Sequence, residues 1–160
     1  MKTLLVYFSY TGNTKMIAKR IKEKLNCDIV EIKPTTPYSN DYEKVVEEEQ
    51  NKAKSDILPS IEKLPMDISS YDRIIIGTPV WWYRAAPPIR TFIKNSNLEN
   101  KVIIPFATNA GWLGKTFKEI KAMCKNSKVE NEMNIVFGSY SDKLVTSEKD
   151  LEAWISSLKE

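Results

Sequence analysis

Residues 4–14 read LLVYFSYTGNT, an apolar run that changes at residue 9 into a short polar loop. An uninterrupted apolar run of this length is typical of a strand that is buried on both faces. Beyond the loop, Ile17, Ile21 and Leu25 recur at every fourth position, and this spacing predicts one buried face of a helix. The stretch therefore predicts a strand, a tight loop and a helix in direct succession.

Four further apolar runs resemble the first one, and they lie at Ile29–Ile32, Ile74–Gly77, Val102–Ala107 and Ile135–Gly138. Helical patterns lie between and after these runs, so strand and helix alternate five times along the chain. Such alternation favours right-handed crossovers and a parallel sheet covered by helices on both faces. We therefore predict an α/β fold with an open, doubly wound, five-stranded parallel sheet, built as a single domain over residues 1–160.

Local signals predict where several helices begin. Asn40 with Glu43 resembles a capping box that opens a charged helix through about Lys54. Pro87-Pro88 suits the first turn of another helix, because the amide hydrogens of that turn are unpaired in any case. Two more helices are indicated by the shared face of Phe117, Ile120, Lys121 and Cys124, and by Ser147 and Asp150 as a cap before the apolar stripe of Leu151, Trp154, Ile155 and Leu158.

Ligands of open α/β sheets bind beyond the carboxyl ends of the strands, which directs attention to three loops. Residues 9–14 offer hydroxyl groups, an amide and a glycine turn at a helix N-terminus, where backbone N–H groups and the helix dipole can hold a phosphate. Residues 77–83 carry three consecutive aromatic side chains that could wall a planar ring, and residues 108–114 are small, polar and rich in glycine. Each loop could also be a plain turn, with Thr11 or Thr14 as a helix cap and one or two aromatic side chains packed inward.

The first loop resembles the phosphate loop of the flavodoxin family, whose pattern is S/T-x-T-G-x-T. Gly-x-Pro-x-Trp-Trp at residues 77–82 resembles a bacterial flavodoxin-like subgroup. The resemblance extends across essentially the whole chain. It implies the strand order 2-1-3-4-5, non-covalent flavin mononucleotide (FMN) as cofactor, and electron transfer to redox proteins or to a small-molecule acceptor.

The same resemblance implies a set of FMN-binding residues. They are Ser9, Tyr10, Thr11, Gly12, Asn13 and Thr14 around the 5′-phosphate; Thr78, Pro79, Val80, Trp81, Trp82 and Tyr83 beside the ring; and Thr108, Asn109, Ala110 and Gly111 at its pyrimidine edge. Trp81 and Trp82 are the candidates for stacking on the flavin, in an order that the sequence leaves open. We expect that Thr11→Ala combined with Thr14→Ala weakens FMN binding severely and leaves the fold intact.

Two departures from the family pattern bear on redox chemistry. The formal net charge is +3, whereas flavodoxins are strongly acidic, so we expect a less negative potential for the final reduction step. No glycine lies between Pro79 and Tyr83 to accept a hydrogen bond from the half-reduced ring, and Gly77 lies earlier. The alternative function is therefore an NAD(P)H-dependent flavin or quinone reductase on the same fold, with Arg84 either as an anion-binding residue or as a solvated surface charge.

Two other functional classes have weaker support in the sequence. Residues 109–116 nearly fit GxxxxGK[ST], the phosphate loop of nucleotide-hydrolysing proteins, but Asn109 replaces the first glycine and neither neighbouring strand ends in the aspartate that binds the metal. Lysines crowd residues 15–24 and 115–128, yet nearby acidic residues and the low net charge favour solvated helix faces over a nucleic-acid surface.

The composition narrows the possible chemistry. The chain has no histidine, which removes Ser-His and Cys-His nucleophile pairs and the commonest nitrogen ligand of zinc and iron. Cys27 and Cys124 form no CxxC motif and are expected to be buried thiols in a reducing compartment. Without a recognisable signal peptide or membrane span, we expect a cytoplasmic protein with no metal site, no nucleic-acid partner and no membrane partner, in which the flavin supplies the chemistry and no side chain is catalytic.

Overall fold

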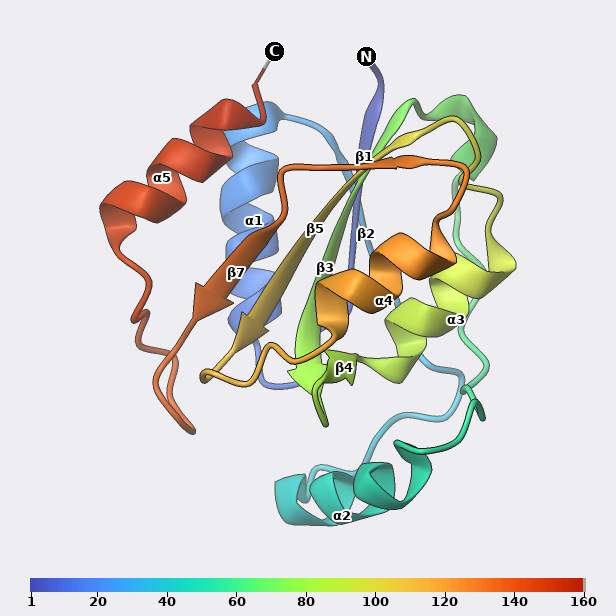
Figure 1. The fold of residues 1–160 in the computed structure, drawn as a ribbon, viewed down its shortest axis with the longest axis vertical. Helices are drawn as coiled ribbons and strands as arrows, with labels where there is room; N and C mark the ends of the chain where they lie inside the picture. The colour runs from blue at the N-terminus through green and yellow to red at the C-terminus, as the bar shows by residue number, and fades with distance from the viewer. Residues whose placement is uncertain (160) are drawn as a thin grey trace.

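A central sheet organises residues 1–159, the part of the chain that the computed structural model describes (Figure 1). Its parallel strands are β1 (Thr3–Tyr7), β2 (Asp28–Glu31), β3 (Arg73–Trp81), β5 (Val102–Asn109), β6 (Lys128–Val129) and β7 (Met133–Val136), and the short β4 (Arg84–Ala85) pairs antiparallel with β3. The order is β2-β1-β3-β5, with β6 and β7 both paired to β5. The predicted order 2-1-3-4-5 is confirmed, with its fifth position divided between two short strands.

The division of the last strand has a local cause. Ile103 of β5 pairs with Val129, and Phe106 pairs with Met133, so residues 130–132 lie opposite only residues 104 and 105. The edge strand therefore carries one extra residue over this interval, as in a β-bulge. Asn131 absorbs the extra length in a left-handed conformation with φ of 53°.

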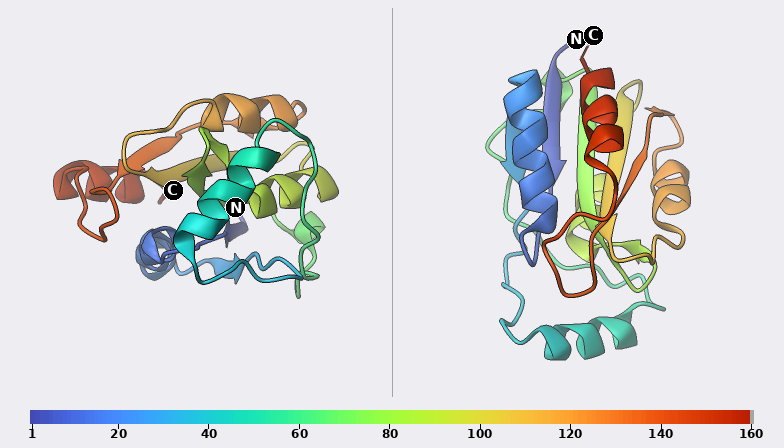
Figure 2. Two further views of the ribbon diagram at one scale, coloured as in Figure 1. Left: turned by 90° about the horizontal axis from the view of Figure 1, so that it is seen from below. Right: turned by 90° about the vertical axis from the view of Figure 1, so that its left-hand side faces the viewer.

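Four helices cover the two faces of the sheet (Figure 2). α1 (Asn13–Leu25) and α5 (Glu148–Ser157) lie on one face, and α3 (Pro87–Asn95) and α4 (Thr116–Met123) lie on the other. Ile74 and Ile76 of β3 pack under α3 and α4, whereas Ile75 between them packs under α1 and α5. All three side chains are fully buried, which explains why this strand is a continuous apolar run rather than an alternating one.

α2 (Tyr42–Lys52) belongs to neither helical layer. It lies across the carboxyl ends of the strands, within the long connection from β2 to β3 that also contains the short 3-10 helix Ile68–Ser70 (Figures 1 and 2). The predicted start of α2 is wrong by one residue: Asp41, and not Asn40, caps the helix, because the Asp41 side chain accepts a hydrogen bond from a backbone N–H of the first turn at 3.3 Å. The helix also ends at Lys52 rather than near Lys54.

Other local predictions agree with the structure. Ser147 caps α5, since its Oγ accepts a hydrogen bond from the backbone N–H of Asp150 at 3.1 Å. Cys27 and Cys124 are buried free thiols, and burial raises the pKa of Cys124 to about 11. No helix within residues 1–159 combines the length and the apolar character that a bilayer crossing requires.

Candidate functional site

Four loops meet at the carboxyl edge of the sheet and enclose a cavity of about 390 Å³. The loops follow β1, β3, β5 and β7, and α2 reaches the same cavity through Tyr42. The cavity is lined by nine of the residues predicted to bind a cofactor: Tyr10, Thr11, Asn13, Pro79, Val80, Trp81, Thr108, Asn109 and Ala110. We call it the phosphate-loop cavity, because the first loop forms one of its walls.

The first loop forms a tight turn at the start of α1. The Oγ of Ser9 accepts hydrogen bonds from the backbone N–H groups of Gly12 and Lys15, both at 3.2 Å. Gly12 has φ of 109°, which a residue with a side chain rarely adopts, and open space lies where its Cβ would be. The turn lies at the N-terminus of α1, which is the positive end of the helix dipole and favours negative charge.

Thr14 is buried, whereas the other residues of the first loop are partly or fully exposed. Its side chain is 1% exposed, and its Oγ1 lies 2.7 Å from Oγ1 of Thr108 in a buried hydrogen bond. Asn13 makes a second link, donating from Nδ2 to the backbone carbonyl of Ser141 at 3.0 Å. Thr14 and Asn13 thus fasten the first loop to the end of β5 and to the loop that follows β7.

The second loop is a tight hairpin between β3 and β4. Trp81 pairs with Arg84 across it, which leaves Trp82 and Tyr83 as the two turn residues, with φ of 51° and 66°. Turns of this kind favour asparagine and glycine, and a bulky residue in a left-handed conformation is strained. Gly114 makes room for the turn, because a Cβ at that position would lie 2.4 Å from Cβ of Tyr83.

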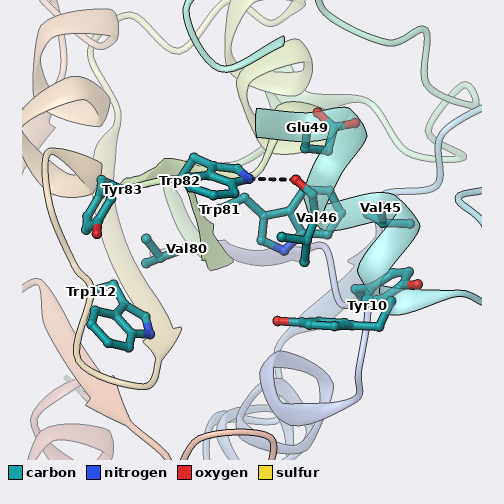
Figure 3. Close-up of a pocket in the computed structure, with 10 residues that line it drawn as sticks. Tyr10, Val45, Val46, Glu49, Val80, Trp81, Trp82, Tyr83 and Trp112 are labelled. Atoms are coloured by element: carbon teal, nitrogen blue, oxygen red, sulfur yellow. Dashed lines mark hydrogen bonds between the residues drawn. The ribbon is translucent and has the colours of Figure 1, made fainter. Parts of the chain in front are cut away.

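The three aromatic side chains of the hairpin make different contacts (Figure 3). Trp81 lines the phosphate-loop cavity and makes edge-on ring contacts with Phe8, Tyr10 and Tyr38, at centroid distances of 5.6, 5.7 and 5.0 Å. The indole Nε1 of Trp82 donates to the backbone carbonyl of Val46 in α2 at 3.0 Å. Tyr83 is 53% exposed. Of the two stacking candidates, only Trp81 lines the phosphate-loop cavity.

Thr78 and Gly77, at the start of the second loop, have structural roles within β3. The Thr78 side chain is fully buried, and its Oγ1 accepts a hydrogen bond from the backbone N–H of Ala86 at 2.9 Å. A Cβ at Gly77 would lie 2.2 Å from the ring of Phe106 on the neighbouring strand. These two residues therefore hold the hairpin and the sheet together, and neither lines the phosphate-loop cavity.

The third loop is held by Asn109. Its Oδ1 accepts hydrogen bonds from the backbone N–H groups of Gly111 and Trp112 at 2.9 and 3.0 Å, and its Nδ2 donates to Oδ1 of Asn134 at 2.7 Å. This side chain fixes the turn before any ligand binds. Trp112 is 55% exposed and stands at the rim of the cavity. Gly111 is exposed and does not line it.

Sequence reasoning missed one wall of this cavity. Residues 137–142, the loop after β7, contribute Phe137, Gly138, Tyr140, Ser141 and Asp142 to its lining. The signal was present in the sequence, because this loop follows an apolar run just as the other three loops do. Tyr140, at 90% exposed, makes an edge-on ring contact with Tyr42 of α2 at 5.5 Å, which brings the loop and the helix together.

A second cavity of about 260 Å³ lies beneath α2 (Figure 3). We call it the α2 cavity. It shares Tyr10, Tyr42, Val80, Trp81 and Trp112 with the phosphate-loop cavity. Its remaining lining residues are Val45, Val46 and Glu49 from α2, and Trp82 and Tyr83 from the hairpin.

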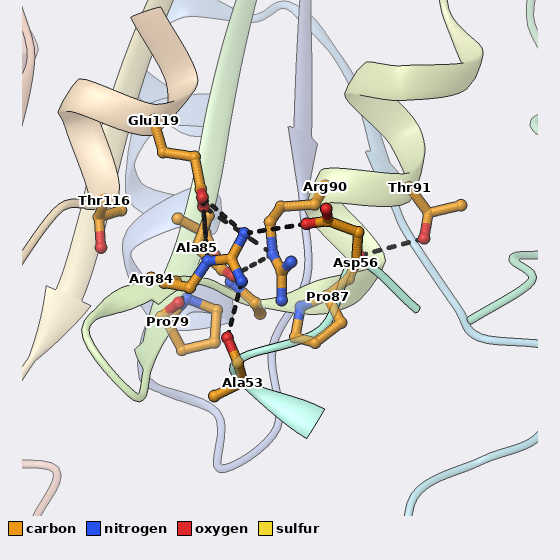
Figure 4. A network of polar contacts seen from close by, with 12 residues as sticks. Ala53, Asp56, Pro79, Arg84, Ala85, Pro87, Arg90, Thr91, Thr116 and Glu119 are labelled. Carbon is orange, nitrogen blue, oxygen red and sulfur yellow. Dashed lines mark hydrogen bonds and ion pairs between the residues drawn. The ribbon is translucent and has the colours of Figure 1, made fainter. Parts of the chain in front are cut away.

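Arg84 is neither an anion-binding residue nor a solvated charge (Figure 4). Its guanidinium pairs with the Glu119 carboxylate at 2.7 Å, and its Nη1 donates to the backbone carbonyl of Ala53 just beyond α2 at 2.9 Å. Both charged side chains are about one-fifth exposed, and the buried Arg90 lies 4.0 Å from Glu119. The cluster ties the hairpin to α4 and to the end of α2.

The charged side chains around the two cavities are acidic. Glu49 lines the α2 cavity and Asp142 the phosphate-loop cavity, and no lysine or arginine of the described residues lines either one. The carboxyl of Glu49 is 8% exposed, and burial raises its pKa, an effect that Lys52 and Arg90 oppose. In the stretch resembling a nucleotide-binding loop, Thr116 is buried and its hydroxyl donates to the carbonyl of Leu113 at 2.8 Å.

An open parallel sheet with loops around a cavity at its carboxyl edge defines a class of ligand-binding α/β proteins. The model of the flavodoxin family matches residues 2–158, so the chain belongs to the flavodoxin family. No curated protein sequence matches the chain significantly.

Several solved structures are similar to the chain over most of its length. A candidate flavoprotein of Bacteroides eggerthii is 27% identical, with 98% of this chain and 97% of that chain covered and a TM-score of 0.79. One of Bacteroides uniformis is 26% identical, with 97% of each chain covered and a TM-score of 0.81. A flavoprotein of Lactobacillus acidophilus in complex with FMN is 27% identical, with 83% of this chain and 91% of that chain covered and a TM-score of 0.70.

Proposed function

We propose that the protein is an electron carrier that holds FMN in the phosphate-loop cavity. The observation that carries this proposal is the meeting of an anion-binding turn, residues 9–14, with the aromatic wall of Trp81 in one cavity. Membership of the flavodoxin family and the similarity to a flavoprotein in complex with FMN support FMN as the cofactor.

The residues around the phosphate-loop cavity fit FMN. A phosphate matches the turn of residues 9–14 at the N-terminus of α1, of which Tyr10, Thr11 and Asn13 line the cavity. A planar ring matches the indole of Trp81 on one side and the small Ala110 loop on the other. The volume of about 390 Å³ lies within the range of small-molecule and cofactor sites.

In this proposal the flavin supplies the redox chemistry, and the protein supplies binding and environment. The first loop anchors the phosphate and therefore sets the position of the whole cofactor. Trp81 and the third loop orient the ring. Tyr42 of α2 and the exposed Tyr140 at the cavity mouth reduce the access of water to it.

A reductase is the second candidate function, and the α2 cavity is the observation in its favour, because a small acceptor needs a place beside the flavin. The lining of both cavities weighs against a nicotinamide nucleotide as the electron donor. A dinucleotide carries several phosphate charges, and neither cavity has a lysine or arginine among its described lining residues.

The comparison of FMN with riboflavin tests the placement of the cofactor. Riboflavin has the same ring and lacks the phosphate. Charge-assisted hydrogen bonds from the first loop to the phosphate predict that FMN binds about a hundredfold more tightly. Equal affinities of FMN and riboflavin in a fluorescence titration would contradict the placement of the phosphate at the first loop.

The choice between carrier and reductase rests on the electron donor. We expect that NADPH leaves the visible absorption of the FMN-loaded protein unchanged over minutes, whereas dithionite bleaches it at once. Prompt bleaching by NADPH would favour the reductase.

A further inference from the structure

We propose that Tyr42 and Tyr140 form a clasp over the mouth of the phosphate-loop cavity, and that this clasp must open before FMN can enter or leave. The inference rests on the proposed function, because FMN is the ligand that the clasp retains. It gives two tyrosines outside the three predicted loops a role in the residence time of the cofactor.

The clasp joins two segments that are far apart in the sequence. Tyr42 is the first residue of α2, Tyr140 lies in the loop after β7, and both segments reach the carboxyl end of the sheet (Figure 1). Both side chains line the phosphate-loop cavity. Their rings meet edge to face, with centroids 5.5 Å apart and an angle of 74° between the ring planes. The contact therefore links two walls of the cavity.

The backbone on each side of the clasp is fixed to the first loop. On the side of α2, the hydroxyl of Tyr10 donates to the backbone carbonyl of Ser39 at 2.5 Å, and the Tyr10 ring lies 6.1 Å from the Tyr42 ring. On the other side, Asn13 donates to the backbone carbonyl of Ser141, the residue that follows the clasp, at 3.0 Å. Because both backbone segments are held, the clasp opens by rotation of side chains.

The Tyr140 ring is free for this role because the core does not use it. The residue is 90% exposed, and among the described residues neither Tyr42 nor Tyr140 belongs to the buried clusters on the two faces of the sheet. The backbone of Tyr140 is left-handed, with φ of 51°, and strained conformations of bulky residues cluster at ligand-binding segments. An exposed ring can swing away without disturbing the core, as a clasp requires.

The charges at the cavity explain why uncharged rings close it. Asp142 lines the phosphate-loop cavity, and no lysine or arginine of the described residues does, so the phosphate has no basic partner there. Burial raises the pKa of Tyr42, so this phenol stays protonated and adds no negative charge at neutral pH. Exclusion of water strengthens hydrogen bonds to the phosphate, so a cover over the mouth compensates for the lack of a basic side chain.

Stopped-flow fluorescence with FMN and the full-length, flavin-free protein tests the clasp. The observed binding rate is plotted against FMN concentration, which gives the association rate from the slope and the dissociation rate from the intercept. We expect Tyr140→Ala to raise both rates about two- to fivefold, because FMN passes only while the contact between the two rings is open. The dissociation constant then stays within about twofold of wild type.

Two results with Tyr140→Ala would overturn the proposal. Rates equal to those of wild type would mean that the ring contact does not control the passage of FMN. A rise of the dissociation rate alone would mean that Tyr140 contacts FMN directly and is no clasp.

Two further variants show whether the ring itself is responsible. Tyr140→Phe keeps the ring and loses the hydroxyl, so we expect both rates to match wild type. Rates like those of Tyr140→Ala would assign the effect to the hydroxyl and contradict the ring clasp. Val145→Ala is the matched control, at an exposed position between β7 and α5 that lies outside the cavity, and is expected to bind FMN like wild type.

A double variant tests the pairing of the two tyrosines. In a Tyr42→Ala background the contact is already lost, so we expect Tyr140→Ala to change neither rate further. Effects that multiply would contradict the pairing. If Tyr42→Ala fails to fold, the comparison of Tyr140→Ala with Tyr140→Phe still decides the proposal. Absence of FMN binding by the wild-type protein would contradict the proposed function and the clasp together, whereas FMN binding with unchanged rates in Tyr140→Ala would contradict the clasp alone.

Discussion

At the scale of single residues, Thr11 and Thr14 differ although both belong to the loop motif. Thr11 is exposed and lines the phosphate-loop cavity. Thr14 is buried and shares a hydrogen bond with Thr108. The expectation that both can be replaced without harm to the fold therefore needs correction for Thr14, because its replacement leaves a buried hydroxyl without this partner.

Single substitutions separate binding from stability. We expect Thr11→Ala to weaken FMN binding and to leave the free energy of unfolding unchanged. We expect Thr14→Ala to lower the free energy of unfolding by about 1–3 kcal/mol, the usual cost of orphaning a buried hydrogen-bonding group. FMN titration and urea unfolding of both variants measure this. A Thr14→Ala variant as stable as wild type would show that the Thr14–Thr108 hydrogen bond contributes nothing.

Residue types in the loops could be predicted from the sequence, but the direction of each side chain could not. The motif identified residues 9–14, yet Thr14 points inward because Thr108 of a distant strand lies opposite. Trp81 and Trp82 are neighbours in sequence, and only the hairpin with its left-handed turn separates them, one into the cluster around Tyr10 and the other toward α2. Such directions depend on tertiary contacts, which local patterns do not contain.

At the scale of elements, the attachment of α2 depends on Arg84. We expect Arg84→Ala to speed hydrogen exchange of the α2 amides and to cost about 1–3 kcal/mol, less than breaking a fully buried ion pair, because it removes the contacts to Glu119 and Ala53. Arg20→Ala is the matched control, since Arg20 joins α1 to α5 through Glu148 on the surface. Hydrogen exchange in α2 that is equal in the two variants would argue against Arg84 as the anchor.

α2 also carries a pH-dependent contribution to stability through Glu49. Burial raises the pKa of Glu49, so the folded protein binds this proton more tightly than the unfolded chain does. The contribution is fully present below the unfolded pKa and is lost as the pH rises through the folded pKa. The groups that act on Glu49 are Lys52 and Arg90, which lower its pKa, and Glu48, which raises it, while Tyr38 also interacts with it.

The sign of this effect predicts the behaviour of Glu49→Gln. We expect the variant to gain stability relative to wild type on going from pH 4 to pH 7, because glutamine has no charge to bury. Urea unfolding at the two pH values measures the difference, with Glu47→Gln, an exposed position on the same helix, as the control. A relative stability of Glu49→Gln that falls toward pH 7 would contradict the assignment.

The elements themselves were well predicted from the sequence, and their placement less so. The continuous apolar runs identified β1, β3 and β5, because strands buried on both faces have no polar alternation. Apolar runs also identified β2 and β7, although these two strands are only partly buried. The position of α2 across the strand ends could not be predicted, since its charged sequence has only Val45 and Glu49 buried. The division of the edge strand depends on a bulge that the local sequence pattern did not predict.

At the scale of the whole molecule, the net charge of +3 predicts a salt effect on the redox potential. A positive field stabilises the anionic reduced flavin, and salt screens this long-range field. We expect the potential of the final reduction step to become more negative as the ionic strength rises from about 0.01 M to about 0.5 M. A potential that rises with salt would mean that the nearby carboxyl groups of Glu49 and Asp142 outweigh the net charge.

The measurement that tests the central claim most directly is the visible spectrum of the purified protein after addition of FMN, followed by stepwise reduction. We expect a bound-flavin spectrum and reduction in two separate one-electron steps, as an electron carrier requires. Direct passage to the two-electron form would contradict the carrier function and favour a reductase. Absence of FMN binding would contradict the account as a whole, because residues 9–14, 77–83 and 108–114 would then be structural turns.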